Sequence, residues 1–414
     1  TYKYMTLINK NLSNLTYLFI ISLLLSCSSG QEKKLPQEPI SCDILISNGT
    51  IYDGSGSKPY VGSLAIKDNK IIYVGENTDF QADTVIDATD LAVSPGFINM
   101  LSWGYNSLMD DGRALSDLKQ GVTLEIFGEG TSPGPYWKDG KFTSFGEAMT
   151  MLEEKGVSVN IGSFLGAATT RILEVGYKNR QATPSEMERM RGHVENSMKE
   201  GAMGIGSSLI YAPGDYASTE ELTELSKVAS EYGGMYISHL RSEGTNLLEA
   251  LEELISISRN ANIPAEVYHL KASREPNWSK LDDVIKRIEE VRKEGLKITA
   301  DIYTYNASST GLTGVIPTWV QEGGHRAWIN RMKDPEVRPR LLADIREQLD
   351  EQPPEGILLV GFKTSKMSRK YLAKTVAADS ITTHWASLIK SKAVSYTHLR
   401  AHETKANLVC RLLL

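Results

Sequence analysis

The sequence has few cysteines, no strongly basic segment and no apolar run long enough to span a membrane. It holds only 3 Cys in 414 residues, which is too few for a disulfide framework. Its formal net charge is −6 and no block of Lys and Arg has interleaved aromatic residues, so we expect no nucleic-acid partner. Its N-terminal apolar run, Leu15 to Ser26, has twelve residues, whereas a membrane-spanning helix needs about 20.

What remains is an ordinary globular composition. The chain is 41% hydrophobic and 23% charged, and its Gly and Pro residues are spread along it, which excludes collagen, low complexity and wholesale disorder. At roughly 150 residues per domain, the length allows two or three domains, or one large barrel with an appendage.

Residues 1–30 have the pattern of a signal peptide and tether. Lys3 and Lys10 precede the apolar run, which is short enough for the hydrophobic region of a signal peptide. The run ends in Leu-Leu-Ser-Cys at Cys27, which resembles the lipobox of bacterial lipoproteins. That resemblance implies lipidation of Cys27 and a lipid-anchored location in the bacterial cell envelope, on the periplasmic or outer-membrane side. A plain secretory signal is the alternative.

Residues 393–414 resemble translated sequencing adapter and have neither a helix cap nor a usable strand alternation. We therefore expect this tail to be artefactual, and we expect no chemistry from His398, His402 or Cys410. A Cys/His metal site in the tail is the alternative. On this interpretation the natural protein continues beyond about residue 390.

The region between these ends divides into two patterns. Residues 42–93 show short apolar runs separated by turn signals such as Asn48-Gly49 and Asp68-Asn69, which predict hairpins in a small β-sheet. From there on, an apolar strand followed by a helix repeats about every 30 residues, and capping boxes begin at Thr183 and Ser218. The expected strands are 92–101, 122–128, 157–166, 202–209, 235–240, 264–270 and 297–304.

These repeats predict an α/β protein with parallel strands, of the (β/α)8 TIM barrel type. Seven strands are counted by residue 304, and a closed barrel needs eight. The eighth is either in 357–362 or missing together with the natural C-terminus.

Polar side chains that close these strands are the candidates for chemistry, because a barrel gathers the carboxyl ends of its strands at one mouth. His239 and His269 end adjacent predicted strands one repeat apart, which suits a pair of Zn²⁺ ligands. Glu129 follows another strand between two glycines and can add a carboxylate. Structural histidines and a solvent-exposed glutamate are the alternatives.

Three further charged residues lie near these positions. Arg241 and Lys271 each follow a histidine by two, so in a strand they share its face and could hold a substrate carboxylate. Rim charges are the alternative. Asp301, within an apolar strand, needs a partner if it is buried, and it could orient a histidine or Lys271.

Several segments, in their order and spacing, resemble the N-acyl-D-amino-acid deacylase (D-aminoacylase) family of the amidohydrolase superfamily over about residues 43–375. The segments are Asn48–Gly54, Ser94–Ile98, Ser207–Gly214, His239–Glu243, His269–Lys271 and Asp301–Tyr305. The resemblance implies a β-sandwich over 42–93 beside a metal-dependent hydrolase barrel over 94–392, which is incomplete because its last strand is missing.

The resemblance also implies Zn²⁺-dependent hydrolysis of the amide of N-acyl-D-amino acids to a D-amino acid and a carboxylate. One Zn²⁺ would be held by Glu129, His239 and His269, where Glu129 replaces the family's usual Cys with a harder ligand. The residues implied around the substrate carboxylate are Lys271, Tyr211, Tyr303 and Ser309.

Two positions depart from the superfamily pattern. Leu101 and Trp103 stand where a His-x-His pair would bind a second metal, so we expect one ion. The general base should be an Asp at the end of strand eight, and Asp379 comes several tens of residues too early for that place. We therefore expect the full gene product to be active, and this chain to lack its base, to be inactive and to be marginally stable.

Two other functions remain open. One is a different amidohydrolase, acting on cyclic amides or D-dipeptides. The other is a non-catalytic surface lipoprotein that binds such ligands, which the lost His-x-His pair favours and the retained metal-ligand set opposes. Bound zinc near one equivalent distinguishes an enzyme from a binder.

Overall fold

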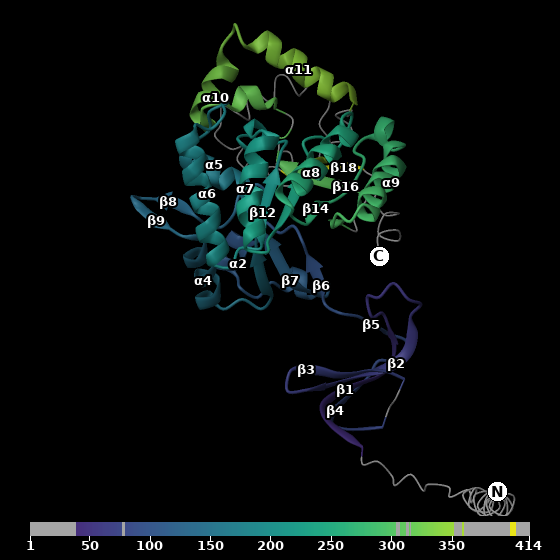
Figure 1. Ribbon diagram of the computed structural model, residues 1–414. Coiled ribbons are helices and arrows are strands. Elements are labelled where there is room, and N and C mark those ends of the chain that lie inside the picture. The colour runs from purple at the N-terminus through teal and green to yellow at the C-terminus, as the bar shows by residue number, and fades with distance from the viewer. Residues whose placement is uncertain are drawn as a thin grey trace, which may run out of the picture. The chain divides into compact units, whose positions relative to one another are not determined.

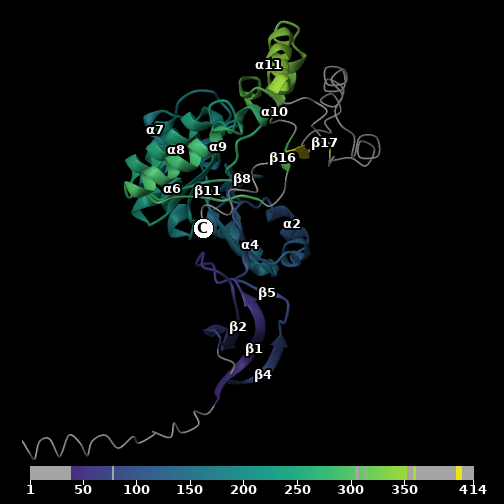
Figure 2. The same cartoon turned by 90° about the vertical axis from the view of Figure 1, so that its right-hand side faces the viewer.

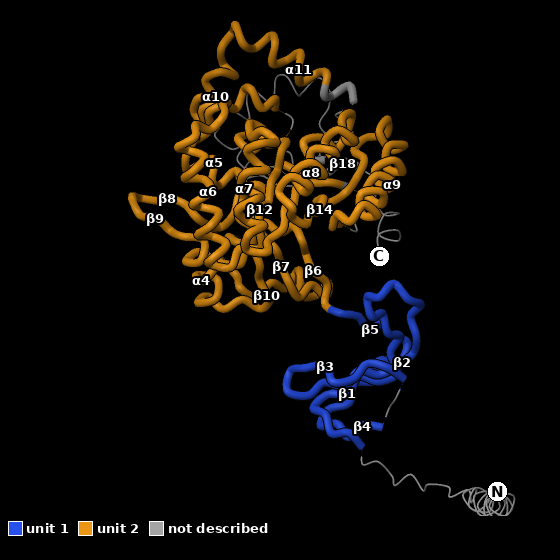
Figure 3. The backbone as a smooth tube through the Cα atoms, viewed as in Figure 1, with its two compact units in different colours: residues 1–95 blue, residues 96–414 orange. Residues whose placement is uncertain are grey.

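The computed structural model describes residues 39–76, 79–303, 307–311, 314, 316–351, 358–359 and 398–402. The chain divides into two compact units, 1–95 and 96–414 (Figure 3). Cys27, Asp379 and the expected signal segment lie outside the described residues. Among the helices that are described, none combines the length and the apolar character that a membrane crossing requires.

The first unit is a five-stranded sheet. Its strands are β1 (Ile40–Ile51), β2 (Tyr60–Lys67), β3 (Lys70–Gly75), β4 (Phe80–Asp87) and β5 (Ala92–Val93). The order is β3-β2-β1-β4, with β5 also on β1, and β4 and β5 run parallel to β1. The expected small β domain is confirmed, and its described strands form one sheet rather than the two layers of a sandwich.

One turn prediction in this unit is wrong. β1 runs straight through Asn48-Gly49, where its register against β2 shifts and Asn48 has a φ of +62°. A bulge therefore uses the Asn-Gly signal that a hairpin also favours. The turn at Asp68-Asn69 is confirmed, because both residues have positive φ between β2 and β3.

The second unit is built on parallel strands. They are β6 (Phe97–Asn99), β7 (Val122–Phe127), β10 (Asn160–Ser163), β11 (Leu165–Gly166), β12 (Gly204–Ser208), β13 (Met235–His239), β14 (Ala265–Val267) and β15 (Ile298–Ala300). Neighbours pair in the orders β10-β7-β6 and β11-β12-β13-β14-β15. Only Phe164 separates β10 from β11, so both belong to the expected strand 157–166, which pairs with one sheet through β10 and with the other through β11. Counting β10 and β11 as one strand, the described strands fill seven consecutive positions of the barrel. The expected strand 92–101 is divided: Ala92–Val93 joins the first unit and Phe97–Asn99 joins the barrel.

Helices follow most of these strands and form the outer layer around them (Figures 1 and 2). They are α4 (Phe145–Lys155), α5 (Ala167–Glu174), α6 (Pro184–Lys199), α7 (Thr219–Glu231), α8 (Leu247–Ala261) and α9 (Lys280–Lys293). The predicted capping box at Thr183 is confirmed, and Ser218 accepts the Glu221 N–H at the start of α7. The apolar faces of these helices bury Leu222, Leu251 and Val284 in one core with the strands.

Shorter elements complete the unit. They are α2 (Tyr105–Asp110), α3 (Leu115–Leu118), β8 (Tyr136–Lys138), β9 (Lys141–Thr143), the 3₁₀ turns η1 (Gly214–Tyr216), η2 (Glu275–Asn277) and η4 (Thr318–Gln321), then α10 (Gly324–Lys333) and α11 (Arg338–Glu351).

The C-terminal part differs from expectation in two ways. β16 (Ala307–Gly311), β17 (Leu358–Leu359) and β18 (His398–His402) form a small sheet of order β16-β18-β17. The described part of the expected eighth strand, β17, does not extend the barrel, because it pairs antiparallel with β18 and with no described barrel strand. The tail was expected to form no element, but β18 adds to β16, whose backbone groups offer an unpaired strand edge.

Candidate metal centre

The three predicted ligands meet at the carboxyl ends of their strands. His239 is the last residue of β13, and Glu129 and His269 each come two residues after β7 and β14. One ligand atom from each residue lies within 4.8 Å of the other two. Gly128 makes this approach possible, since it has a φ of +108° and a Cβ there would lie 2.3 Å from the Phe164 carbonyl oxygen. The parallel strands thus bring together residues up to 140 positions apart.

The distances fit a single small cation. Glu129 Oε1 lies 2.8 Å from His239 Nδ1 and 3.8 Å from His269 Nε2, and the two nitrogens are 3.1 Å apart. Ligands about 2.1 Å from a tetrahedral ion would be about 3.4 Å from one another, which lies within this range. A carboxylate with two imidazoles is also a donor set that Zn²⁺ favours.

Burial supports the same conclusion. Glu129 is 7% exposed and His239 is 5% exposed. The second ring nitrogen of His239, Nε2, is buried with no hydrogen-bond partner among the described residues. This nitrogen lies 3.5 Å from Glu243 Oε1, so Nδ1, on the other edge of the ring, is the atom that faces Glu129 and His269.

His269 is held in place by contacts to its backbone and to Nδ1, the ring nitrogen on the side away from the ligand cluster. Its backbone N–H donates to Asp301 Oδ1 at 2.7 Å, and its Nδ1 lies 3.0 Å from Glu243 Oε1. Lys271 Nζ is 2.5 Å from the same Glu243 oxygen and 2.9 Å from His269 Nδ1. These contacts leave Nε2 directed at Glu129 and His239, as outer partners of a metal ligand commonly do.

The electrostatics favour a positive charge in the cluster. Burial works to raise the pKa of Glu129, but the hydrogen bond from His239 and the nearby His269 imidazole lower it below its usual range. Burial lowers the pKa of His239. Burial and Lys271 also work to lower the pKa of His269, yet Glu243 and Glu129 raise it to about 9. A cation between these groups would replace the proton that His269 binds here.

Comparison with known proteins agrees with this geometry. The curated D-aminoacylase of Alcaligenes xylosoxydans xylosoxydans is 30% identical over 285 residues, which cover 65% of this chain and 59% of the relative. The N-acyl-D-glutamate deacylase of the same organism is 27% identical over 284 residues, which cover 65% and 58%. The chain is thus similar to D-aminoacylases over about two thirds of its own length. It spans less than two thirds of the length of these curated relatives.

Structural comparison also finds proteins with a similar fold. The N-acyl-D-glutamate deacylase of Bordetella bronchiseptica, solved with zinc and a phosphonate mimic of the tetrahedral intermediate, superposes with a TM-score of 0.69. It is 21% identical and the match covers 90% of this chain and 73% of that one. The predicted α/β barrel with a small β domain is thereby confirmed. No model of a known protein family matches the chain.

The residues that the D-aminoacylase resemblance placed around the substrate divide into two groups. The Tyr211 ring centre lies 5.6 Å from that of His239, and the Tyr303 ring centre 6.4 Å from that of His269. Lys271 Nζ lies 5.7 Å from the centre of the Tyr303 ring, so these three side chains border the ligand cluster. Ser309 is exposed on β16, and its neighbour Thr310 makes the hydrogen bond to the Tyr211 hydroxyl.

Arg241 does not point into the centre, so that prediction is wrong. Its guanidinium donates to both carboxylate oxygens of Glu253 at 2.8 and 2.9 Å and to the backbone carbonyls of Asp215 and Ala217. β13 ends at His239, so the alternation that would return Arg241 to the same face stops there. The residue instead ties the end of β13 to α8 and to η1.

Two residues of the centre had no role in the sequence analysis. Glu243 contacts Lys271 and His269, and its position four residues after His239, within a segment that carries the family resemblance, was the available signal. Trp103 was recognised only as unable to bind metal, yet its Nε1 donates to Glu129 Oε2 at 2.8 Å.

Proposed function

We propose that the protein carrying this chain is a zinc-dependent hydrolase that cleaves the amide of N-acyl-D-amino acids to a D-amino acid and a carboxylate. The observation that carries this proposal is the cluster of Glu129, His239 and His269 at the strand ends of a barrel similar in fold to solved N-acyl-D-amino-acid deacylases. The names of its relatives, D-aminoacylase and N-acyl-D-glutamate deacylase, support the substrate class.

The residues of the metal centre would have three different roles. Glu129, His239 and His269 would hold the zinc, which when bound lowers the pKa of a water and polarises a carbonyl. Glu243 accepts from the Nδ1 side of His269 and so fixes which ring nitrogen faces the centre. Lys271 is 5% exposed, and its ammonium now donates to Glu243. The same ammonium would pair with a substrate carboxylate, either beside Glu243 or in its place.

A pocket of about 390 Å³ beside Glu129 supports a substrate with a neutral, apolar group. Aromatic and aliphatic side chains make up much of its lining, including Trp103, Ile172, Tyr211 and Trp328. Its described lining contains no Lys or Arg, and its ionisable side chains other than tyrosine are Glu129 and His325. An anionic side chain placed there would lose hydration without a Lys or Arg to pair with, and it would lie near the Glu129 carboxylate. This pocket chemistry resembles a site for a D-leucine or D-phenylalanine derivative more than one for D-glutamate.

We therefore expect higher turnover of N-acetyl-D-leucine than of N-acetyl-D-glutamate, by about 10-fold or more in kcat/KM. Ile172→Arg places a cation in the pocket. It is expected to lower the ratio of kcat/KM for N-acetyl-D-leucine to kcat/KM for N-acetyl-D-glutamate by at least about 10-fold, because the new guanidinium can pair with the glutamate side chain. Tyr232→Arg, on the exposed end of α7, is the matched control and should leave the ratio unchanged. A wild-type preference for D-glutamate contradicts this assignment of the pocket.

The reaction itself is tested with the natural gene product. Zinc-loaded protein is incubated with N-acetyl-D-amino acids, with D-dipeptides and with cyclic amides, and release of amine is measured before and after chelation. We expect release from the N-acyl substrates, its loss with a chelator and its return with zinc. Faster turnover of a cyclic amide or D-dipeptide indicates another amidohydrolase, and bound zinc with no turnover of any of them indicates a binding protein.

We also propose that the protein is anchored to the cell envelope through a lipid on Cys27, on the strength of the apolar run and lipobox-like segment before it. Cells fed a traceable fatty acid should incorporate it into the wild type, and the protein should sediment with membranes. Cys27→Ser is expected to lose both properties. Label retained on the variant would exclude this anchor.

A further inference from the structure

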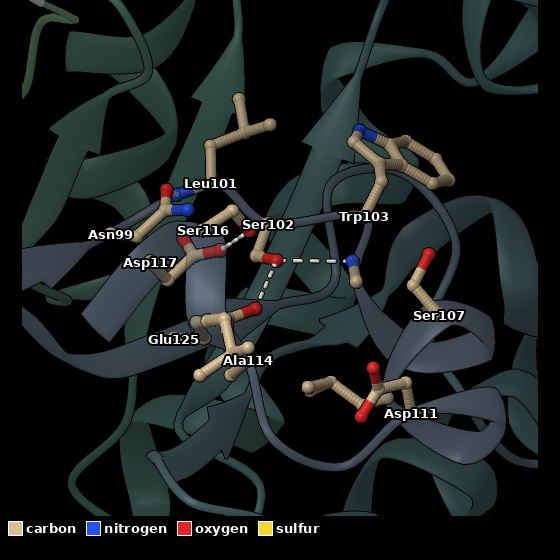
Figure 4. A pocket seen from close by; sticks show the side chains of 13 residues that line it. Asn99, Leu101, Ser102, Trp103, Ser107, Asp111, Ala114, Ser116, Asp117 and Glu125 are labelled. Carbon is tan, nitrogen blue, oxygen red and sulfur yellow. Dashed lines mark hydrogen bonds between the residues drawn. The ribbon is translucent and has the colours of Figure 1, made fainter. Parts of the chain in front are cut away.

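The segment after β6 places an indole, rather than an imidazole, against the ligand cluster. Leu101 and Trp103 lie on either side of Ser102, as Figure 4 shows. Trp103 lines the pocket beside Glu129 and also a second pocket of about 450 Å³ beneath it. Its ring is therefore at the boundary between the metal centre and the side of the barrel next to β6.

The two oxygens of Glu129 have different partners. Oε1 is the oxygen near the histidines, and it also lies 3.3 Å from the Ser208 hydroxyl. Oε2 accepts the indole N–H of Trp103 at 2.8 Å. An indole nitrogen only donates, so it binds no metal, and a hydrogen bond to a carboxylate is among the stronger ones in proteins.

The backbone around Trp103 is fixed although 61% of the residue is exposed. The Ser102 N–H donates to the Ile126 carbonyl at 2.8 Å, and the Ser102 hydroxyl donates to Glu125 Oε2 at 2.6 Å. The Gly104 N–H in turn donates to the Ser102 hydroxyl at 3.0 Å (Figure 4). These bonds to β7 hold the backbone on both sides of Trp103, and the bond to Glu129 Oε2 then sets the direction of its indole N–H.

We infer that Trp103 is a positioning residue that binds the outer oxygen of Glu129 and presents only Oε1 to a single Zn²⁺. In this arrangement the indole N–H engages Oε2, so that oxygen is not free to bind a second cation. Leu101 offers no lone pair, and the described part of the chain holds no second group of three metal-ligating side chains as close together. The inference rests on the proposed function, because it assigns zinc to the same three ligands.

The test compares Trp103→Phe with Trp137→Phe in the full chain. Phe keeps the ring but has no N–H, and Trp137 is a matched control because it is 64% exposed on β8, away from the ligands. Zinc content is measured by elemental mass spectrometry, and affinity by competition with a coloured chelator. We expect one equivalent in the wild type, an affinity about 10–100-fold lower for Trp103→Phe, and no change for Trp137→Phe.

A second readout follows the indole directly. Binding of Co²⁺ near Trp103 should quench part of the tryptophan fluorescence, and this part should be lost in Trp103→Phe and kept in Trp137→Phe. Unchanged zinc affinity in Trp103→Phe, or two equivalents in the wild type, overturns the role of Trp103 and leaves the proposed hydrolase intact. A wild type that binds no zinc overturns both.

Discussion

His239→Ala is expected to empty the metal centre. Zinc content should fall from about one equivalent to near zero, because two remaining ligands do not hold the ion and the lost imidazole is the most deeply buried of the set. Hydrolysis by the natural gene product should fall by more than the roughly 100-fold that removal of an outer partner costs. Elemental analysis of the purified variant and kcat/KM for an N-acetyl-D-amino acid measure the two effects.

The control for this experiment is His193→Ala. His193 is on α6, where it pairs with Glu174 at 2.8 Å and belongs to no ligand cluster. It should keep its zinc and its activity. Glu129→Gln provides a second test with nearly unchanged shape, and it should lose affinity because the anionic oxygen is gone. Full zinc content in His239→Ala would show that other residues hold the ion.

Arg171→Met is expected to destabilise the fold by about 3–5 kcal/mol. Arg171 is fully buried, and its Nη1 lies 2.6 Å from Glu221 Oε2, which is 3% exposed. Its Nη2 also donates to the carbonyls of Lys178 and Arg180 in the loop after α5. Burial raises the pKa of Glu221, and Arg171 opposes that effect. Removing the guanidinium leaves a buried carboxylate and two carbonyls without their donor.

Urea denaturation followed by circular dichroism measures this loss. Arg113→Met is the control, since Arg113 pairs with Asp111 at the surface and should change the midpoint little. The double variant Arg171→Met with Glu221→Met should recover part of the stability, because no charge then stays buried alone. If Arg171→Met unfolds at the same urea concentration as the wild type, the pair does not stabilise the α5–α7 contact.

Much of the barrel could be predicted because its signals are local. Apolar runs about 30 residues apart located seven parallel strands, and Thr183 and Ser218 marked two helix starts that the structure confirms. Asn48-Gly49 was misread because the same dipeptide suits a bulge and a hairpin. The partner of β17 could not be predicted, because an apolar run does not indicate which edge it will pair with.

Topology predicted the histidine pair of the ligand cluster, and the family resemblance added Glu129 as the third ligand. Parallel strands bring their ends together, so Glu129, His239 and His269 meet although they are far apart in sequence. Arg241 was misplaced because strand alternation was extended past the end of β13. The contacts of Glu243 and Trp103 were not predicted, because they depend on the conformation of the loops after the strands. The spacing of residues along the sequence does not determine that conformation.

The central claim is that these three residues hold one zinc ion. The most direct measurement is an anomalous difference map, recorded above and below the zinc absorption edge, from crystals of the zinc-loaded protein. We predict a single peak bounded by Glu129 Oε1 and the ring nitrogens of His239 and His269, with none beside Leu101 or Trp103. A map without a peak between these three side chains, or with its strongest zinc peak at other ligands, would contradict the account.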